Sequence, residues 1–213
     1  MSSLLVDEIT HSGNTGTSNL VLAGTGNVTV SSDLIATKQN GCERIVLEQY
    51  YGPCDGEDIT LQDGTHTIAA VTGAVNGTTS FVDLGGSNIT YTPPTGTTLV
   101  IYEYNFSVCY QATQSNFCNT QVSIGGTAIG YGEINVGVGQ FADHRVHIKV
   151  GIPIGGTANA NTGRQATWTS GKELKVQAKE PNASHHCQFH GTSHFSNATN
   201  SWAMPYVGIT AIG

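Results

Sequence analysis

The stretch Ile89-Thr90-Tyr91-Thr92-Pro93-Pro94-Thr95-Gly96-Thr97-Thr98 decides the fold, because its Pro-Pro-x-Gly corner separates two β-patterned runs. Proline has a fixed φ and no amide donor, so we expect the corner to lie outside any hydrogen-bonded ladder. In the run that follows, apolar side chains alternate with polar ones, which is typical of a strand buried on one side. The apolar face comprises Val100, Tyr102, Tyr104, Phe106, Val108 and Tyr110, and the polar face comprises Glu103, Asn105 and Ser107.

Similar short runs recur through residues 42–213, which we expect to form one domain. Turn-forming pairs such as Asn76-Gly77 and Gly125-Gly126 lie between these runs, as is usual between antiparallel strands. The pattern predicts an all-β fold, an antiparallel jelly-roll sandwich. The expected strands are residues 44–50, 66–71, 79–84, 97–110, 120–124, 133–138, 146–152, 173–178, 185–190 and 205–212.

The composition excludes several classes of protein. Only 11% of the residues are charged, against about 25% in ordinary soluble domains. The net charge is −7 with only eight Lys and Arg, scattered along the chain, so we expect no binding to nucleic acid. No apolar stretch approaches the roughly 20 residues that cross a bilayer, so we expect no membrane insertion. The start of the chain lacks the features of a secretory signal, and we expect the protein to be assembled in a cytoplasm.

Residues 1–36 differ from the rest of the chain. Their apolar residues fall in short patches at 4–6, 20–22 and 28–30, separated by polar and glycine-containing stretches. Each patch is too short to fold alone, since isolated two-stranded ribbons are marginal in water. We therefore expect residues 1–36 to be an extended N-terminal arm that docks onto another subunit or another protein.

The five cysteines are Cys42, Cys54, Cys109, Cys118 and Cys187. Cys42 could pair with Cys54 across a loop, and Cys109 could pair with Cys118. The favoured interpretation is that the cysteines are small buried hydrophobes in a reducing compartment. No Cys-x-x-Cys motif occurs, so a zinc ribbon is not supported.

The best candidate for a metal site is the tract His185-His186-Cys187-Gln188-Phe189-His190-Gly191-Thr192-Ser193-His194. Read as a strand, it places His186 and His190 on one face. Two histidines at this spacing need a third ligand, which the other copies in a trimer could supply. The favoured interpretation is a polar, partly solvated strand face. We assign no metal-binding residue here, and whether His186 and His190 bind metal stays open.

Two other segments carry reactive side chains. Ala142-Asp143-His144-Arg145 has no accompanying nucleophile motif, so we expect a charged turn and no hydrolase site. Asp55-Gly56-Glu57-Asp58 and Asp63-Gly64 lack the calcium-loop pattern with its closing Glu, so we expect acidic turns. We assign no catalytic and no cofactor-binding residue, and we expect that the protein is not an enzyme.

Aromatic residues offer a binding surface. Trp168, Trp202, Tyr206 and Tyr131 could line a sugar-binding face, because aromatic rings stack on carbohydrate and anchor interfaces. The favoured alternative for each is packing within the sandwich or at a contact between subunits.

Several segments together resemble a family of virion proteins from marine bacteriophages, including cyanophages. They are Ser3-Leu4-Leu5-Val6-Asp7-Glu8-Ile9, the corner at 88–97 with Val100-Ile101-Tyr102, Phe189-His190-Gly191-Thr192, and the closing residues 205–213. Such domains are similar in layout to the jelly rolls of the tumour-necrosis-factor type, which usually associate as trimers. The family has no catalytic motif to carry over.

The resemblance implies a non-enzymatic virion structural protein. We expect a homotrimer, anchored to other virion proteins through residues 1–36, which displays the β domain of residues 42–213 on the particle. A short tail fibre that contacts a host receptor such as surface glycan is favoured. A capsid decoration protein that stabilises the shell is the first alternative, and a carbohydrate-binding module is the second.

Overall fold

The computed structural model describes residues 44–110, 116–130, 134–138, 143–184, 187–192 and 201–213. Their regular elements are strands and a short 3-10 helix, joined by loops, which confirms the all-β class. The expected arm, residues 1–36, lies outside them. In chain order the elements are β1 (Val46–Pro53), β2 (Asp58–Leu61), β3 (Gly64–Thr67), β4 (Val75–Asn76), β5 (Val82–Asp83), β6 (Ile89–Tyr91), β7 (Leu99–Tyr110), β8 (Asn116–Ile124), β9 (Thr127–Ala128), β10 (Ile134–Val138), β11 (His144–Pro153), the 3-10 helix η2 (Ala160–Thr162), β12 (Lys172–Lys179), β13 (Cys187–Phe189) and β14 (Tyr206–Ile212).

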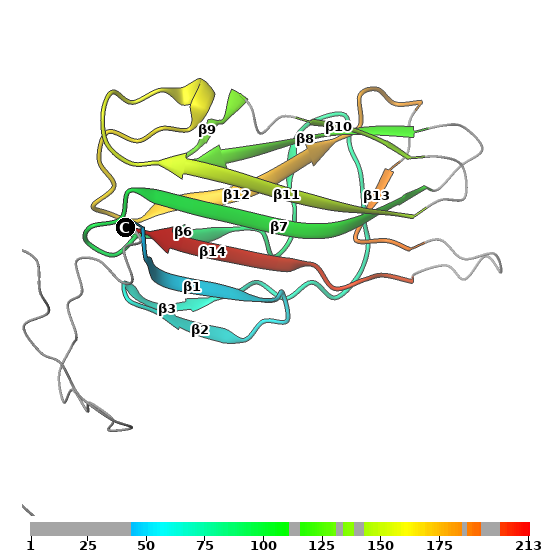
Figure 1. Ribbon diagram of the computed structural model, residues 1–213. Helices are drawn as coiled ribbons and strands as arrows, with labels where there is room; N and C mark the ends of the chain where they lie inside the picture. The colour runs from blue at the N-terminus through cyan, green and yellow to red at the C-terminus, as the bar shows by residue number, and fades with distance from the viewer. Residues whose placement is uncertain (1–43, 111–115, 131–133, 139–142, 185–186, 193–200) are drawn as a thin grey trace, which may run out of the picture. The chain divides into compact units, whose positions relative to one another are not determined.

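Two antiparallel sheets form a sandwich around one core (Figure 1). In the first sheet β14 lies between β1 and β7. Strand β11 also pairs with β7, and β13 and β4 continue the sheet beyond β7. In the second sheet β8 lies between β10 and β12, with β5 and β6 on β12 and β9 on β8. Neighbours such as β7 and β14 come from distant parts of the chain, a connectivity typical of jelly rolls.

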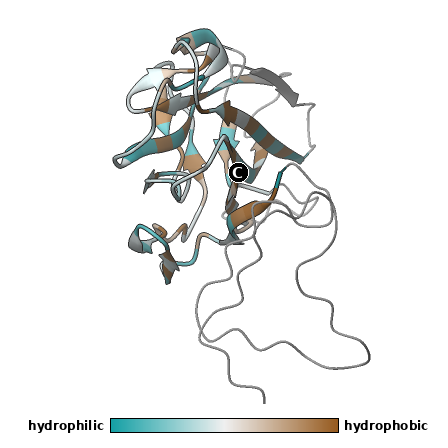
Figure 2. Ribbon diagram, turned by 60° about the vertical axis from the view of Figure 1, so that its left-hand side comes forward, coloured by the Kyte–Doolittle hydropathy of each residue, from teal (hydrophilic) through white to brown (hydrophobic). Residues whose placement is uncertain are grey.

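Strand β7 runs through the centre of the core. Its residues Val100, Tyr102, Tyr104, Phe106 and Val108 are all fully buried, as the alternation predicts. The apolar residues of β11 lie opposite them in register and are buried as well. Hydrophobic and hydrophilic residues alternate along the strands in Figure 2, so each sheet presents one apolar face to the other.

The Pro-Pro-x-Gly corner lies between β6 and β7, as expected. The amide of Thr97 donates to the carbonyl oxygen of Pro94 at 3.2 Å, and the Thr97 hydroxyl donates to the same oxygen at 2.7 Å. Gly96 has a φ of +92°, which is the left-handed conformation that a type II turn requires at this position. Neither Pro93 nor Pro94 belongs to a strand, so the missing amide donors cost no ladder bond.

Some expected strands differ in length or position. The segment 66–71 is a strand only as far as Thr67. Ile68 and Val71 belong to the loop that follows, and their side chains are buried in the core. Their amides donate to the carbonyl oxygens of Glu57 and Cys54 at 3.2 and 2.9 Å, so loop contacts replace a ladder. Residues 79–84 form only the short β5, and of the expected strand 185–190 the structure describes residues 187–190, in which β13 covers Cys187–Phe189. The strand β2 was not expected at all.

Two of the cysteines lie in the core as free thiols, Cys54 and Cys118. Neither disulfide considered from the sequence, Cys42–Cys54 or Cys109–Cys118, is therefore formed. The Cys54 thiol donates to the carbonyl oxygen of Gly86 at 3.3 Å, and burial, together with the charge of Asp55, raises the pKa of Cys54 to about 12. The interpretation as small buried hydrophobes is confirmed for these two residues.

Candidate binding surface on the first sheet

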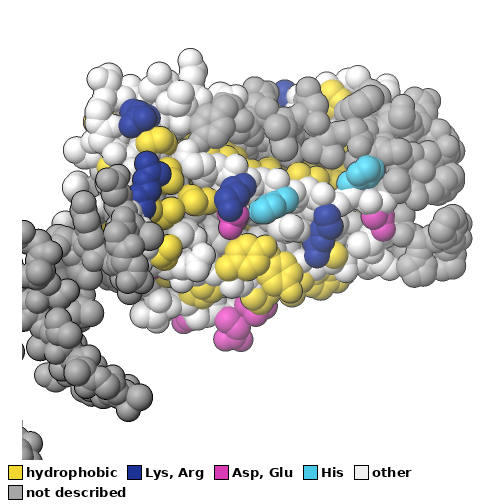
Figure 3. Space-filling view, viewed as in Figure 1, with side chains coloured by type: hydrophobic (Ala, Val, Ile, Leu, Met, Phe, Trp, Pro, Cys, Tyr) yellow, Lys and Arg dark blue, Asp and Glu magenta, His cyan; other side chains and the backbone are white. Residues whose placement is uncertain are grey.

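Two exposed tyrosines lie side by side on the outer face of the first sheet. Tyr51 of β1 and Tyr206 of β14 are 53% and 37% exposed. Their rings stack, with centroids 6.0 Å apart and planes inclined by 14°. Figure 3 shows a hydrophobic patch over these two strands. We call this pair, Tyr51 and Tyr206, the tyrosine platform.

The register of β1 and β14 brings the two rings together. Tyr51 lies opposite Gly208, and Tyr206 lies opposite Pro53, so the tyrosines are diagonal neighbours on one face of the sheet. Gly208 provides the space for the Tyr51 ring, because a Cβ at Gly208 would lie 2.5 Å from Cδ2 of Tyr51. The ring therefore lies close against the backbone of β14.

Polar side chains of β7 and β11 flank the platform. Asn105 is the register partner of both Tyr206 and His147. The carboxylate of Glu103 lies 2.7 Å from the Lys149 ammonium and 3.6 Å from Nε2 of His147. Because the side chains of Lys149 and His147 are 57% and 50% exposed, they can still donate to a ligand. Figure 3 shows basic and histidine side chains beside the hydrophobic patch.

This arrangement suits a ligand that has a flat apolar face edged by hydroxyl groups. Tyrosine rings offer a π-face for stacking and a hydroxyl for hydrogen bonding. The rim adds a carboxylate acceptor at Glu103, an amide at Asn105 and donors at His147 and Lys149. A pyranose sugar has both required features, since its C–H groups form an apolar face and its hydroxyls radiate from the edge.

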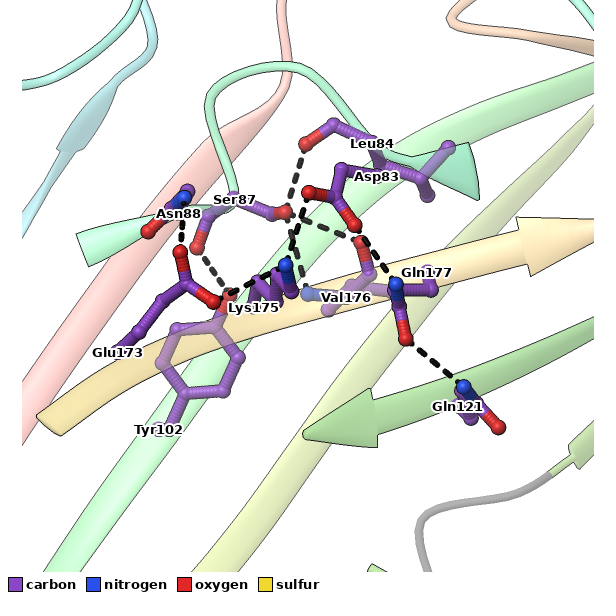
Figure 4. A network of polar contacts seen from close by, with 10 residues as sticks. All are labelled: Asp83, Leu84, Ser87, Asn88, Tyr102, Gln121, Glu173, Lys175, Val176 and Gln177. Atoms are coloured by element: carbon purple, nitrogen blue, oxygen red, sulfur yellow. Dashed lines mark hydrogen bonds and ion pairs between the residues drawn. The ribbon is translucent and has the colours of Figure 1, made fainter. Parts of the chain in front are cut away.

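The outer face of the second sheet, in contrast, is closed by its own contacts (Figure 4). The Lys175 ammonium lies 2.9 Å from Asp83 and 3.0 Å from Glu173. Gln177 donates to Asp83 at 2.7 Å, and Gln121 donates to Gln177 at 2.8 Å. Partial burial alone would raise the pKa of Asp83, but hydrogen bonds from Lys175 and Gln177 lower it; Lys175 also lowers the pKa of Glu173. These contacts occupy the Lys175 ammonium, whose side chain is only 16% exposed.

Of the aromatic residues that the sequence offers for a sugar surface, Tyr206 lies on the platform. Trp168 is buried, and its indole N–H donates to the carbonyl oxygen of Tyr91 at 2.9 Å. Trp202 packs against the core. Tyr131 falls in a part of the chain that the structure does not describe.

Tyr51 is the functional candidate that sequence reasoning missed. Tyr50 and Tyr51 are adjacent, and their neighbours do not alternate clearly. Only the pairing with β14 shows that Tyr50 packs against the core and Tyr51 faces outward. The one available signal is Gly208 within the closing strand, since glycine within a strand often marks a close approach.

His190 lies in the core, which corrects the expectation of a partly solvated strand face. Strand β13 ends at Phe189, and His190 has a φ of +63°, so the alternation breaks and the ring turns inward. It packs edge-on against Tyr104 and Phe106, with centroids 6.5 and 6.1 Å away. Among the described residues, neither ring nitrogen of His190 has a hydrogen-bond partner, and burial lowers the pKa of His190 to about 4.

His186 lies outside the described residues, so the question of a metal held by His186 and His190 stays open. In the described part of the chain, no group of three or more His, Cys, Asp or Glu side chains is placed to hold a metal ion. No helix among the same residues is long and apolar enough to cross a membrane.

The acidic segments turn the chain at Asp55–Gly56 and at Asp63, whereas Asp58 and Gly64 are already the first residues of β2 and β3. Asp55 accepts a hydrogen bond from the amide of Glu57 at 3.1 Å. The two oxygens of Asp63 contact the ring of His66 at 2.7 Å and the amide of Thr92 at 2.6 Å. In the segment 142–145 the structure differs from the expected turn, because His144 and Arg145 are the first residues of β11.

Comparison with known proteins gives only distant likenesses. No protein-family model and no curated protein matches the chain. Among solved structures, a chain of the infectious bursal disease virus Gx strain matches with a TM-score of 0.33 and 8% identity, over 78% of this chain and 41% of that chain. A chain of the Gt strain of the same virus matches with a TM-score of 0.26 and 9% identity, over 74% and 47%. This chain spans less than half the length of either.

Proposed function

We propose that this chain is a non-enzymatic structural protein of a bacteriophage particle, which displays its β domain on the particle surface and contacts host-surface glycan through the tyrosine platform. The observation that carries the proposal is the pair of stacked, exposed rings of Tyr51 and Tyr206 beside a polar rim. Both rings stand on paired strands of a sheet. A preorganised surface of this kind loses little conformational freedom on binding, which favours recognition.

The assembly is part of the same proposal. Residues 1–36 anchor the chain to other virion proteins, and the β domain associates as a homotrimer. Closed threefold association hides strand edges that would otherwise invite aggregation, and β1 is such an edge among the described strands of the first sheet. A short tail fibre fits a surface that binds glycan better than a capsid decoration protein does, because decoration requires contact with the shell alone.

The glycan contact is tested on an array of bacterial surface polysaccharides with the purified full-length chain. Tyr51→Ala and Tyr206→Ala should each weaken binding about tenfold or more, which corresponds to about 1.4 kcal/mol. Val75→Ala is the control, because Val75 is an exposed apolar residue of β4 that lies outside the platform. Absence of binding by the wild-type chain, or unchanged binding by both tyrosine variants, would contradict the glycan contact.

The assembly is tested separately by light scattering and by electron microscopy of the particle. A homotrimer has a mass of three times 22.3 kDa. A chain that starts at Thr37 should keep the trimer if the β domain carries the association. Gold-labelled antibody should mark tails; labelling of many copies on heads would instead support a decoration protein.

A further inference from the structure

A second polar surface lies where β8, β9 and β12 meet the loop of residues 154–165. It is a hollow of about 390 Å³, and its polar lining consists of Thr127, Asn159, Arg164, Gln165 and Lys172. None of the residues that line the hollow is acidic, although the chain as a whole carries a net charge of −7. Sites for small molecules usually have volumes of about 300–1,000 Å³, so the hollow is large enough for more than a bare ion.

Strand alternation in β12 directs a cation into this hollow and keeps the adjacent carboxylate out. Lys172 lies on the same side of β12 as Leu174 and Val176, which are buried between the sheets. Glu173 faces the opposite side, where its carboxylate lies 3.0 Å from Lys175. The charge of Lys172 is therefore not neutralised by its neighbour in sequence.

The loop that carries Arg164 is held by a dense set of hydrogen bonds. Asn159 caps η2 through its side-chain oxygen, and Gly163 ends the helix with a φ of +72°. The amide of Gln165 donates to Pro153 at 2.9 Å, and the amide of Gly155 donates to Gln165 at 2.9 Å. The Arg164 guanidinium donates to the carbonyl oxygen of Gly155 at 3.0 Å. One of its five N–H groups is thus fixed, which positions the others.

Both cations of the hollow contact neutral groups. The Lys172 ammonium donates to the side-chain oxygen of Gln165 at 2.6 Å and lies 6.0 Å from the centre of the Trp168 ring. Neither Lys172 nor Arg164 forms an ion pair in the part of the chain that the structure describes, whereas Lys175 contacts two carboxylates. A partly buried cation is stabilised by a charge-assisted hydrogen bond to an anion. Two such cations in one hollow point to an anionic ligand.

We propose that this hollow binds an oxyanion, a carboxylate or a sulfate group. Arg164 matches the planar geometry of a carboxylate and can bind it through two N–H groups, while Lys172 acts as a point charge. The hydroxyl of Thr127 and the side-chain nitrogen of Asn159, whose oxygen caps η2, line the hollow for the rest of the ligand. The side chain of Gln165 instead holds Lys172 and donates to the carbonyl oxygen of Gly163 at 2.9 Å. Acidic sugars and free inorganic anions both carry this chemistry. The site shares no residue with the tyrosine platform and does not depend on the proposed function.

Saturation-transfer NMR on the full-length chain tests the site at constant ionic strength. The probes are glucuronate and glucose 6-sulfate, with glucose as the neutral match. We expect saturation transfer to both acidic sugars to exceed that to glucose, which reports any stacking of the sugar ring on the tyrosine platform. Arg164→Gln and Lys172→Gln should each lower this excess at least fivefold. Arg44→Gln and Lys179→Gln remove equal charges outside the hollow and should leave the excess unchanged, as should Tyr51→Ala.

Competition identifies the source of the oxyanion. If inorganic sulfate displaces the acidic sugars at similar concentration, the hollow recognises the oxyanion itself. If inorganic sulfate does not displace them, the sugar ring contributes to binding and the ligand is an acidic saccharide. Both results support the site. Equal saturation of glucose and glucuronate, or unchanged signals in both Arg164→Gln and Lys172→Gln with their folds verified by circular dichroism, would overturn it.

Discussion

The phenolic hydroxyl of Tyr102 donates a hydrogen bond to the backbone carbonyl of Ser87 at 2.5 Å. The Ser87 hydroxyl in turn donates to the carbonyl of Leu84 at 2.6 Å and accepts from the amide of Val176 at 3.1 Å. Tyr102 belongs to the first sheet and Val176 to the second, so Ser87 links the two layers (Figure 4). Ser87 and Tyr102 are fully buried, and water cannot replace these bonds.

Ser87→Ala should destabilise the domain by about 1–3 kcal/mol, because the buried amide of Val176 loses its acceptor. Urea denaturation followed by tryptophan fluorescence measures the change in free energy of unfolding. Ser80→Ala is the matched control, since Ser80 is exposed, and it should change stability by less than about 0.5 kcal/mol. Equal stability of the two variants would show that the link between the layers contributes little.

Gly208→Ala should disrupt the tyrosine platform while the sheet stays folded. A Cβ at this position meets the Tyr51 ring at 2.5 Å, so the ring must leave its place against β14 and the stack with Tyr206 is lost. We expect glycan binding to fall about as much as in Tyr51→Ala, with a normal circular dichroism spectrum. Gly151→Ala is the control, because a Cβ there would make an ordinary contact of 3.5 Å with Leu99.

His190 should make the domain less stable in mild acid. The pKa of His190 is lowered to about 4 in the folded chain, from an ordinary value of 6.5. The unfolded chain therefore takes up a proton below about pH 6.5, whereas the folded chain resists protonation until about pH 4. The contribution to stability is present above pH 6.5 and is lost progressively as the pH falls to 4, by up to about 3 kcal/mol.

Urea denaturation of the wild-type chain and of His190→Phe between pH 7 and pH 4 measures this contribution. Carboxylates titrate in both proteins, so the difference between the two pH profiles isolates His190. The variant should lose less stability than the wild-type chain over this interval. His144→Gln, at an exposed histidine, should follow the wild-type profile. Parallel profiles for His190→Phe and the wild-type chain would contradict the assignment.

Cys54 should resist alkylation in the folded protein at pH 8. The thiolate is the reactive form, and a pKa of about 12 leaves very little of it at this pH. Iodoacetamide followed by peptide mass spectrometry should find Cys54 unmodified in buffer and modified in concentrated urea. Rapid labelling in buffer alone would show that the thiol is accessible in the folded chain.

The sequence predicts the long central strands better than the short strands and loops around them. Strands β7, β11, β12 and β14 follow the expected ranges closely, because each combines clear alternation with turn signals at its ends. At Ile68 and Val71 the pattern wrongly predicts a strand, because these buried residues lie in a loop. Apolar residues that a loop places in the core can have the same spacing as those of a strand. His190 shows a second limit, since one residue with positive φ reverses the face that a strand pattern assigns.

The candidate site is less predictable, because it depends on which strands are neighbours. Tyr51 and Tyr206 are 155 residues apart in the sequence and meet only because β1 pairs with β14. The hollow likewise needs β12, the hairpin of β8 and β9, and the loop before Arg164 to meet at one point. No local pattern encodes which distant segments become neighbours, and one sequence taken alone supplies no co-variation to reveal them.

The pairing of β1 with β14 also brings together the two ends of the described domain. Val46 lies opposite Ile212, and the amide of Gly213 donates to the carbonyl oxygen of Ile45 at 2.9 Å. A domain with adjacent ends can be inserted into a surface loop of another protein at a small cost in loop-closure entropy. The β domain is therefore suited to transfer as a unit, by recombination or by engineering, and it would carry both of its outward-facing surfaces with it.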